Sequence, residues 1–429
     1  MIATPGGNAA SVPPLGEFLD AARLWLDEHA ERSATDDQKF VWGEGDFSVA
    51  VFHALTIDEE RALLRRTQAW TQLKAERGYH AIAAPVAYGG LGYPREYGQA
   101  FARLERGYVR PASHETHSVT TRLIAPTIMQ FGDDAQRREL VARFLSAQEL
   151  CCQLFSEPGA GSDLAALGCR AVRDGDEWVV NGQKVWSSGA QFAGWGELIA
   201  RSDPDVQKHK GMTAFVIPMD LPGIDVRPIK QMSGGSSFNE VFFDDVRVPD
   251  SMRLGDEGAG WHVALTTLGF ERDHSDGAGS GRVGGGWHHV IATAQAMGAT
   301  SDPVTRQLLA RSYIHERVES FVARRAAELA RGGTPGPEGS LGKLLWTNGM
   351  NLTSEVISHV LGAALVADSG AWGTFGWGEH VLGAPGYRIA GGSDEVQRNI
   401  IGERVLGLPK EPQVDRDIPF RDLKTGTQR

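Results

Sequence analysis

Hydrophobic positions divide the 429-residue chain into regions that differ in period. Residues 15–150 carry apolar residues at helical spacing, as in RRELVARFLSAQEL. Residues 151–255 contain short apolar runs bounded by Gly, Pro and Asp, which are typical of strands. Residues 256–410 return to the helical period, and residues 411–429 form a polar tail that we expect to be loosely held. The pattern predicts an α+β chain: an N-terminal helical domain, a central β-barrel or sandwich, and a C-terminal four-helix-type bundle.

The central region contains a turn signal beside a tryptophan. The stretch DEWVVNGQKVWSS places Asn-Gly between two strand-like runs, which predicts a two-residue hairpin turn. Trp186 then lies on the outgoing strand, followed by Ser187 and Ser188. A tryptophan in a strand either belongs to the core or lies flat against a planar ligand whose polar edge the hydroxyl groups bond.

The first helix of the third region ends in two charged residues. Its apolar positions follow the i, i+3, i+4, i+7 spacing of one face: Trp261, Ala264, Leu265 and Leu268. Continuing this face predicts that Glu271 and Arg272 point inward, where charge is costly unless it is paired or used. The two residues form either a structural ion pair or a general base whose pKa is set by a dry pocket and a neighbouring cation.

Charge and composition narrow the class of protein. The net charge of −11 argues against general binding to nucleic acid or anionic membranes, although a local pocket can still hold an anionic cofactor. Three cysteines, two of them adjacent, argue against a disulfide framework. The N-terminal stretch lacks the features of a signal peptide, and no run of about eighteen apolar residues occurs. We expect a cytoplasmic protein with no membrane or nucleic-acid partner.

Two motifs that suggest ligand sites are weak. GAGSD lacks the third glycine of a dinucleotide fingerprint, since Leu164 occupies that place. HETH offers His114 and His117 without an obvious third ligand, so a surface or packed pair of histidines is favoured. No metal site is predicted.

The stretch YRIAGGSDEVQRN has the composition of a helix start. Gly391 and Gly392 free the backbone, and Ser393 suits an N-cap. Asp394 and Glu395 suit the first turn. The stretch is either only a well-capped helix or a helix start that a cofactor approaches closely.

Four stretches together resemble the acyl-CoA dehydrogenase family of flavoproteins: LFSEPGAGSD, NGQKVWSSGA, NEVFFDDVRVP and GGSDEVQRNIIGERVLGLP. The resemblance spans about residues 15–410. It implies FAD held between the β domain and the bundle, and an acyl-CoA or acyl-carrier thioester as substrate. It also implies a homotetramer or homodimer and an external electron acceptor, an electron-transfer flavoprotein.

The resemblance assigns roles to individual positions. It implies contacts with FAD or its flavin ring by Phe155, Ser156, Ser162, Trp186, Ser188, Ser393 and Glu395. Ser162 is also expected beside the pantetheine arm, and a backbone N–H near Gly391 beside the thioester oxygen. Glu395 stands where the family has an amide, which is a departure from the pattern.

The resemblance also identifies a base. The family's Tyr-Glu-Gly-Thr carboxylate is absent here, because Ala390 precedes Gly391. LGFER instead fits the Leu-x-x-Glu-Arg variant of members that resemble isovaleryl-CoA dehydrogenase. Glu271 would remove the α-proton, with Arg272 fixing its orientation and contacting substrate, while FAD accepts the β-hydrogen as hydride to give the 2-enoyl thioester.

Two alternatives remain open. One is a flavin monooxygenase or oxidase on the same fold. The other is a weakly active or non-catalytic subunit of a hetero-oligomeric dehydrogenase, which the missing Tyr-Glu-Gly carboxylate and the missing Arg-x-x-Phe-Gly motif of the second bundle helix suggest.

Overall fold

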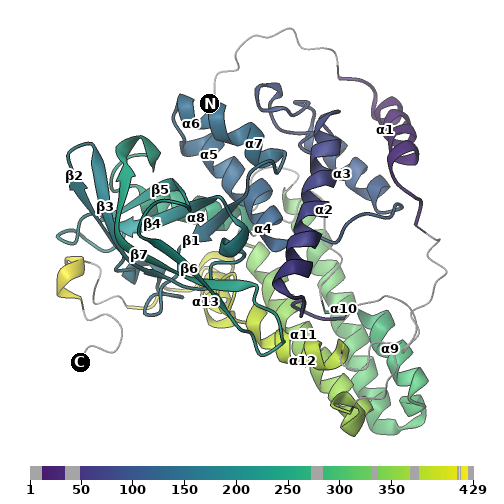
Figure 1. Ribbon diagram of the computed structural model, residues 1–429. Helices are drawn as coiled ribbons and strands as arrows, with labels where there is room; N and C mark the ends of the chain where they lie inside the picture. The colour runs from purple at the N-terminus through teal and green to yellow at the C-terminus, as the bar shows by residue number, and fades with distance from the viewer. Residues whose placement is uncertain are drawn as a thin grey trace.

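The computed structural model describes residues 12–33, 49–271, 284–330, 337–367, 376–412, 415 and 417–423, with the backbone alone at 271, 327 and 330. Within these ranges the chain forms helices, then a sheet, then helices again (Figure 1). The predicted order of helical, β and helical parts is therefore confirmed.

The first helices surround an aromatic cluster. Their bounds are α1 (Leu15–His29), α2 (Ile57–Ala75), α3 (Arg95–Glu105), α4 (Glu115–Ser118), α5 (Ala125–Phe131), α6 (Asp134–Gln136) and α7 (Ala142–Leu145), with π-helical turns at Val119–Ile124 and Arg137–Val141. Thr56 begins α2 with a capping box that pairs it with Glu59. Phe18 of α1 packs edge-on against Tyr97 of α3 with ring centroids 5.2 Å apart, which fixes α1 on α3.

The central strands belong to one open sheet rather than to a closed barrel or two stacked sheets. Their bounds are β1 (Cys151–Leu154), β2 (Arg170–Asp174), β3 (Glu177–Lys184), β4 (Trp195–Arg201), β5 (Met212–Pro218), β6 (Ile224–Ile229), β7 (Phe238–Pro249) and β8 (Arg253–Leu254). The order across the sheet is β6-β7-β3-β2-β4-β5-β8, with β1 pairing in parallel with β4.

The predicted Asn-Gly hairpin is wrong. Asn181 and Gly182 lie inside β3, which runs on against β7 through a shift of register between Val180 and Gly182. Gly182 has φ +148°, and a Cβ there would collide with Cys169, so the glycine serves a bulge rather than a turn. The hairpin turn lies earlier, between β2 and β3, where Gly175 has φ +65°.

The third region begins with α8 and continues as a bundle. Its bounds are α8 (Gly260–Glu271), α9 (Trp287–Ala296), α10 (Pro303–Ala330), α11 (Gly339–Leu361), α12 (Gly376–Tyr387) and α13 (Asp394–Ile400), which a π-helical turn extends over Ile401–Val405. Buried side chains of α9 to α12, such as Val290, Val356 and Trp377, form one core that also takes in Val49. The segment that precedes α2 therefore packs on the bundle, although the sequence places it with the N-terminal helices.

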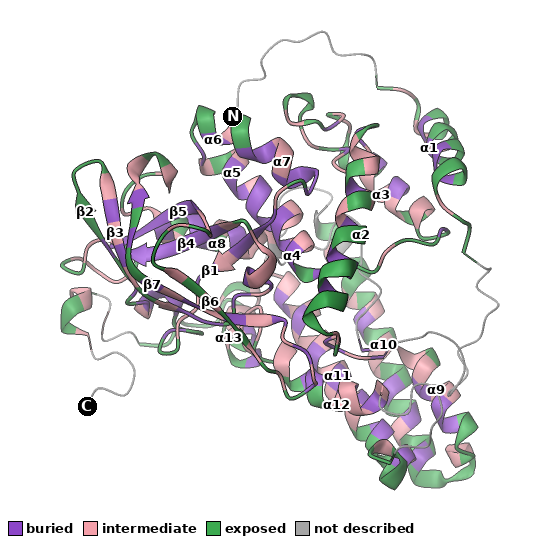
Figure 2. Ribbon diagram, viewed as in Figure 1, coloured by how far each residue is buried: buried purple, intermediate pink, exposed green. Residues whose placement is uncertain are grey.

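Both faces of the sheet are covered. One face packs with α5, α7 and α8 in a core that contains Phe144, Ala214 and Val263. The other core, around Trp178 and Phe215, consists mainly of side chains from the strands themselves. Figure 2 shows this as buried colour running through the strands and the helices that lie on them.

Helix α8 buries a face that is rotated slightly from the one predicted. As predicted, Ala264 is buried and Trp261 and Leu268 pack partly against the core, but Leu265 is 39% exposed. Val263 and Thr267 are buried in addition. Small side chains on this face let the helix lie close to β5.

The described part of the tail makes contacts that the sequence does not predict. Residues 415 and 417–423 lie against the loop between β4 and β5, and Phe420 N–H donates to the Val206 carbonyl at 2.9 Å. No helix in the described ranges is long and apolar enough to cross a membrane.

Candidate functional site

Trp186 lies just beyond β3 in an exposed, constrained conformation. Its φ is +62°, which is uncommon for a bulky residue, and 60% of it is exposed. Its ring meets Phe238 edge-on at 6.0 Å. The structure excludes the interpretation of Trp186 as a core tryptophan, because more than half of the residue is exposed.

The residue after Trp186 pins the turn to β7. Ser187 and Asn239 exchange backbone hydrogen bonds of 3.1 Å, and the Asn239 side chain donates to the Ser187 carbonyl at 2.9 Å. The Ser187 hydroxyl and the Asn239 Oδ1 are buried without a partner among the described residues. A buried polar atom without a hydrogen bond destabilises the fold, so these two atoms are candidates to bond a ligand next to Trp186.

Ser188 faces the N-terminal helices. Its hydroxyl donates to the Glu115 carboxyl group; burial raises the pKa of Glu115, and this hydrogen bond opposes the rise. Glu115 is nevertheless counted among the exposed residues, so its carboxyl lies among protein atoms while part of the side chain reaches solvent. Gly189 follows with φ +60°, and a Cβ there would overlap the Thr116 hydroxyl, so this approach requires glycine.

Phe155 and Ser156 continue β1 beside the same turn. The Phe155 carbonyl accepts from the buried Lys184 ammonium at 2.9 Å, and the Ser156 carbonyl accepts from the Val185 N–H at 2.9 Å. Lys184 also pairs with Glu157 at 2.8 Å. These bonds join the end of β1 to the end of β3 and so place Phe155 and Ser156 beside the turn that carries Trp186.

Ser162 lies in the loop that follows β1. Ser162 and Asp163 are exposed, and the Asp163 carboxylate accepts from Lys208 at 3.0 Å. The loop is therefore open at Ser162 and anchored immediately after it.

The start of α13 forms a separate group. Ser393 caps the helix by accepting from the Val396 N–H at 3.3 Å, and Gly391 has φ +64°, as the cap interpretation requires. The Glu395 side chain is 75% exposed and lies 3.5 Å from Arg398. Within the described ranges, no hydrogen bond, ion pair or ring contact joins Gly391, Ser393 or Glu395 to the Trp186 turn.

The predicted base lies at the edge of the described structure. Glu271 is the last residue of α8, where only the backbone is described, and Arg272 lies outside the described residues. Their inward orientation stays a prediction.

A buried carboxyl group that the sequence does not reveal, Glu197, contacts Thr267, which lies one helical turn before Glu271. Thr267 donates to Glu197 on β4 at 2.7 Å and pairs with Thr127 on α5 at 3.0 Å. Burial raises the pKa of Glu197 to about 8. The only signal in the sequence is a glutamate inside the strand pattern GELIARS. This pattern does not indicate that the partner is Thr267, 70 residues away.

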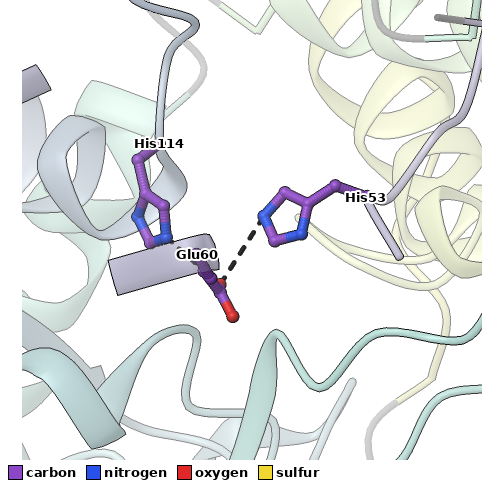
Figure 3. Close-up of side chains that lie close together, drawn as sticks. All are labelled: His53, Glu60 and His114. Carbon is purple, nitrogen blue, oxygen red and sulfur yellow. Dashed lines mark hydrogen bonds and ion pairs between the residues drawn. The ribbon is translucent and has the colours of Figure 1, made fainter. Parts of the chain in front are cut away.

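His114 belongs to a cluster with His53 and Glu60, shown in Figure 3. The Glu60 carboxylate lies 3.1 Å from His114 Nε2 and 3.5 Å from His53 Nε2. His114 Nδ1 accepts from the Thr116 N–H at 3.2 Å, so in the neutral ring the proton is on Nε2 and points to Glu60. A metal ion at Nε2 would need that proton removed, so the contacts favour a hydrogen-bonded network over metal ligation. His117 is not part of it; His117 Nε2 lies 2.8 Å from the Thr71 hydroxyl.

Three family models match most of the chain. They are the acyl-CoA dehydrogenase N-terminal domain at residues 48–148, the middle domain at 152–246 and the C-terminal domain at 258–406. Among curated proteins, the acyl-CoA dehydrogenase IpdE1 of Mycobacterium tuberculosis is 36% identical over 353 residues, which cover 82% of this chain and 90% of that protein.

Solved structures of the same architecture carry related names. A structure named Tcur3481-Tcur3483 steroid ACAD matches with a TM-score of 0.70 and 25% identity, covering 94% of this chain and all (100%) of the other. The ChsE4-ChsE5 complex from Mycobacterium tuberculosis matches with a TM-score of 0.68 and 26% identity, covering 94% and 100%.

Proposed function

Because the chain belongs to the acyl-CoA dehydrogenase family, we propose that it binds FAD and oxidises the acyl group of an acyl-CoA thioester to the 2-enoyl thioester. FAD, when bound, supplies the hydride acceptor. The observation that carries the proposal is Trp186, a tryptophan that is 60% exposed just beyond a strand end. The next residue, Ser187, has a buried hydroxyl without a partner among the described residues.

The residues at the Trp186 turn fit a planar ring with a polar edge. Trp186 offers a flat apolar face, and the buried hydroxyl of Ser187 lies beside it without a partner. Ser188 donates to Glu115, which leaves the oxygen of Ser188 free to accept from a ring N–H. The carbonyls of Phe155 and Ser156 are used within the chain, so we assign their N–H groups and the Ser156 hydroxyl as the donors toward the ring edge.

We assign the phosphates and ribose of FAD to Ser393 and Glu395 at the start of α13, and the pantetheine arm to Ser162. Gly391 and Gly392 keep the backbone before α13 free of side chains, and a helix N-terminus favours an anion. Glu395 brings a negative charge to this place, which opposes a phosphate, so we assign it to a ribose hydroxyl rather than to a phosphate oxygen.

Glu271 is proposed as the base that takes the α-proton, with Arg272 holding its carboxylate. A backbone N–H at Glu271 or near Gly391 would stabilise the thioester oxygen as it gains charge. Electrons then leave to an external acceptor, for which we propose an electron-transfer flavoprotein. The similar structure named steroid ACAD makes a steroid-derived acyl group the first class to test.

The surface of α10 supports the proposal that this chain is one subunit of an oligomer. Ile314, Val318 and Phe321 are 59%, 43% and 53% exposed and follow an i, i+4, i+7 spacing, which forms one apolar face, the α10 stripe. Exposed apolar faces of this kind mark protein–protein contacts. We propose that another subunit of the same fold covers the stripe, either a second copy or, as the ChsE4-ChsE5 complex suggests, a related chain.

One experiment separates the candidate functions. The protein is reconstituted with FAD and titrated without oxygen with butyryl-CoA, octanoyl-CoA and a steroid side-chain CoA thioester. Bleaching of the flavin absorbance supports a dehydrogenase. Bound flavin that no thioester bleaches favours the monooxygenase or oxidase alternative, and failure to bind FAD favours a non-catalytic subunit.

A further inference from the structure

The described end of the chain leaves the bundle and docks on the sheet. Figure 1 shows it crossing from α13 to the far side of the β domain. Phe420 N–H donates to the Val206 carbonyl at 2.9 Å, and Arg421 N–H donates to the Pro204 carbonyl at 3.0 Å. Pro419 also forms a bridge with Gln207. The tail therefore adds backbone hydrogen bonds to the loop 202–211, which joins β4 to β5.

A first route leads from the tail to the loop that carries Ser162. Arg201 ends β4, is only 3% exposed, and places its guanidinium carbon 3.9 Å from the centre of the Phe420 ring. The same guanidinium donates to the Ala165 carbonyl at 2.6 Å. Burial lowers the pKa of Arg201 to about 10, as expected for a cation that an aromatic ring shields from water. Phe420 therefore covers the guanidinium group of Arg201, and the same group donates a hydrogen bond to the Ser162 loop at Ala165.

A second route reaches the same loop through charge. The Lys208 ammonium lies 2.9 Å from the Asp415 carboxylate and 3.0 Å from the Asp163 carboxylate, and its side chain is 13% exposed. The hydrogen bonds to Asp415 and Asp163 outweigh burial and raise the pKa of Lys208. One lysine thus ties the tail to the residue that follows Ser162.

We propose that the tail, residues 415 and 417–423, is a positioning segment that holds the Ser162 loop, residues 159–167, in the conformation that binds the pantetheine arm of the thioester. The inference rests on the proposed function, because that function places the arm at Ser162. The Ser162 loop contains Gly159 and Gly161, and a glycine-rich loop loses more freedom on binding unless it is ordered beforehand. Two anchors on the C-terminal side of Ser162 provide that order.

The test uses the full-length FAD-loaded protein and two tail variants. Asp415→Ala removes the second route, and Phe420→Leu keeps apolar bulk but removes the ring face above Arg201. Asp225→Ala is the matched control, since Asp225 pairs with Arg227 at 2.6 Å on the exposed strand β6 and touches neither loop. We measure KM and kcat for the thioester that bleaches the wild type fastest, and amide exchange at Ala166 and Leu167, whose N–H groups bond within the Ser162 loop.

Each tail variant is expected to raise KM by about twofold to fivefold, the effect of losing one partly exposed contact, with kcat and flavin content unchanged. Exchange at residues 166 and 167 is expected to be faster in both variants and unchanged in Asp225→Ala. A purely structural tail would lower the melting temperature without raising KM, and that result overturns the proposal. An equal rise of KM in the control overturns it as well.

The exchange measurement keeps the proposal separate from the proposed function. If no thioester bleaches the wild type, the dehydrogenase function fails on its own evidence. In that case, faster exchange of the Ser162 loop in Asp415→Ala and Phe420→Leu alone still supports positioning by the tail. Unchanged exchange overturns it.

Discussion

Thr267 on α8 donates a hydrogen bond of 2.7 Å to Glu197 on β4, and both residues are buried. The second oxygen of Glu197 is buried without a partner among the described residues. A carboxylate in this position would be charged and poorly solvated, so burial raises the pKa of Glu197 to about 8 and the group is protonated at neutral pH. The contact joins the β domain to the helix that ends in Glu271.

Stability should therefore fall as pH rises between the unfolded and folded pKa values of Glu197, 4.5 and about 8. In this window the folded chain holds a proton that the unfolded chain has lost, so the free energy of unfolding decreases by up to about 1.4 kcal/mol per pH unit. Glu197→Gln replaces the neutral acid with a neutral amide of the same shape and should remove this decline. Chemical denaturation at pH 6 and pH 8 measures both slopes.

The matched control is Glu257→Gln, which changes an exposed carboxylate next to α8. Its decline between pH 6 and pH 8 should equal that of the wild type. Equal slopes for the wild type and Glu197→Gln would mean that Glu197 is ionised in the folded protein.

Trp186→Ala should release flavin and leave the fold intact. Trp186 is 60% exposed, so its removal is expected to cost less than about 1 kcal/mol of the free energy of unfolding. Trp178→Ala, at a position 1% exposed, should instead cost about 3–5 kcal/mol and lower the helical signal of the whole protein. Circular dichroism and the flavin content after gel filtration measure the two effects. A Trp186→Ala protein that retains FAD would exclude the assigned contact.

The sequence predicted the three-part order because period 2 and period 3.6 differ over many residues. The sequence-based prediction failed where the same residues occur in two backbone geometries. Asn-Gly is typical of a hairpin turn, but Gly182 lies in a bulge, where Cys169, the residue before β2, approaches its backbone. The prediction for the tail failed for a related reason. Its polar composition does not indicate that Phe420 packs against Arg201, a buried residue of the β domain.

The residues of the candidate site also fall into two groups, those that the sequence predicted and those that it did not. Residues close in sequence to a motif, such as Trp186 and Ser188, were predicted from the sequence and lie together in the structure. Glu115, Glu197 and His53 were not, because their roles depend on partners from distant segments. The HETH motif did draw attention to His114, but its partner Glu60 lies 54 residues away, and no local spacing points to it.

The α10 stripe predicts a change in the size of the assembly. Phe321→Glu places a charge on a face that another subunit would cover, so dissociation into smaller species is expected. Val172→Glu is the control, because Val172 is a single exposed apolar residue (56%) on β2. Light scattering after gel filtration gives the mass of each variant. A mass unchanged by Phe321→Glu would show that the stripe is not the contact.

Glu271→Gln distinguishes the base from a structural ion pair. A general base contributes about 10²–10⁴-fold to rate, and glutamine keeps the shape of glutamate without accepting the proton. The variant should keep FAD and bind acyl-CoA, while anaerobic stopped-flow bleaching slows by about that factor. If Glu271 instead only neutralises Arg272, the loss of a buried partner should cost about 3–5 kcal/mol of the free energy of unfolding and leave bleaching nearly normal. The two roles thus predict opposite changes in one variant, since a base shows itself in rate without loss of stability, and a structural partner in stability without loss of rate.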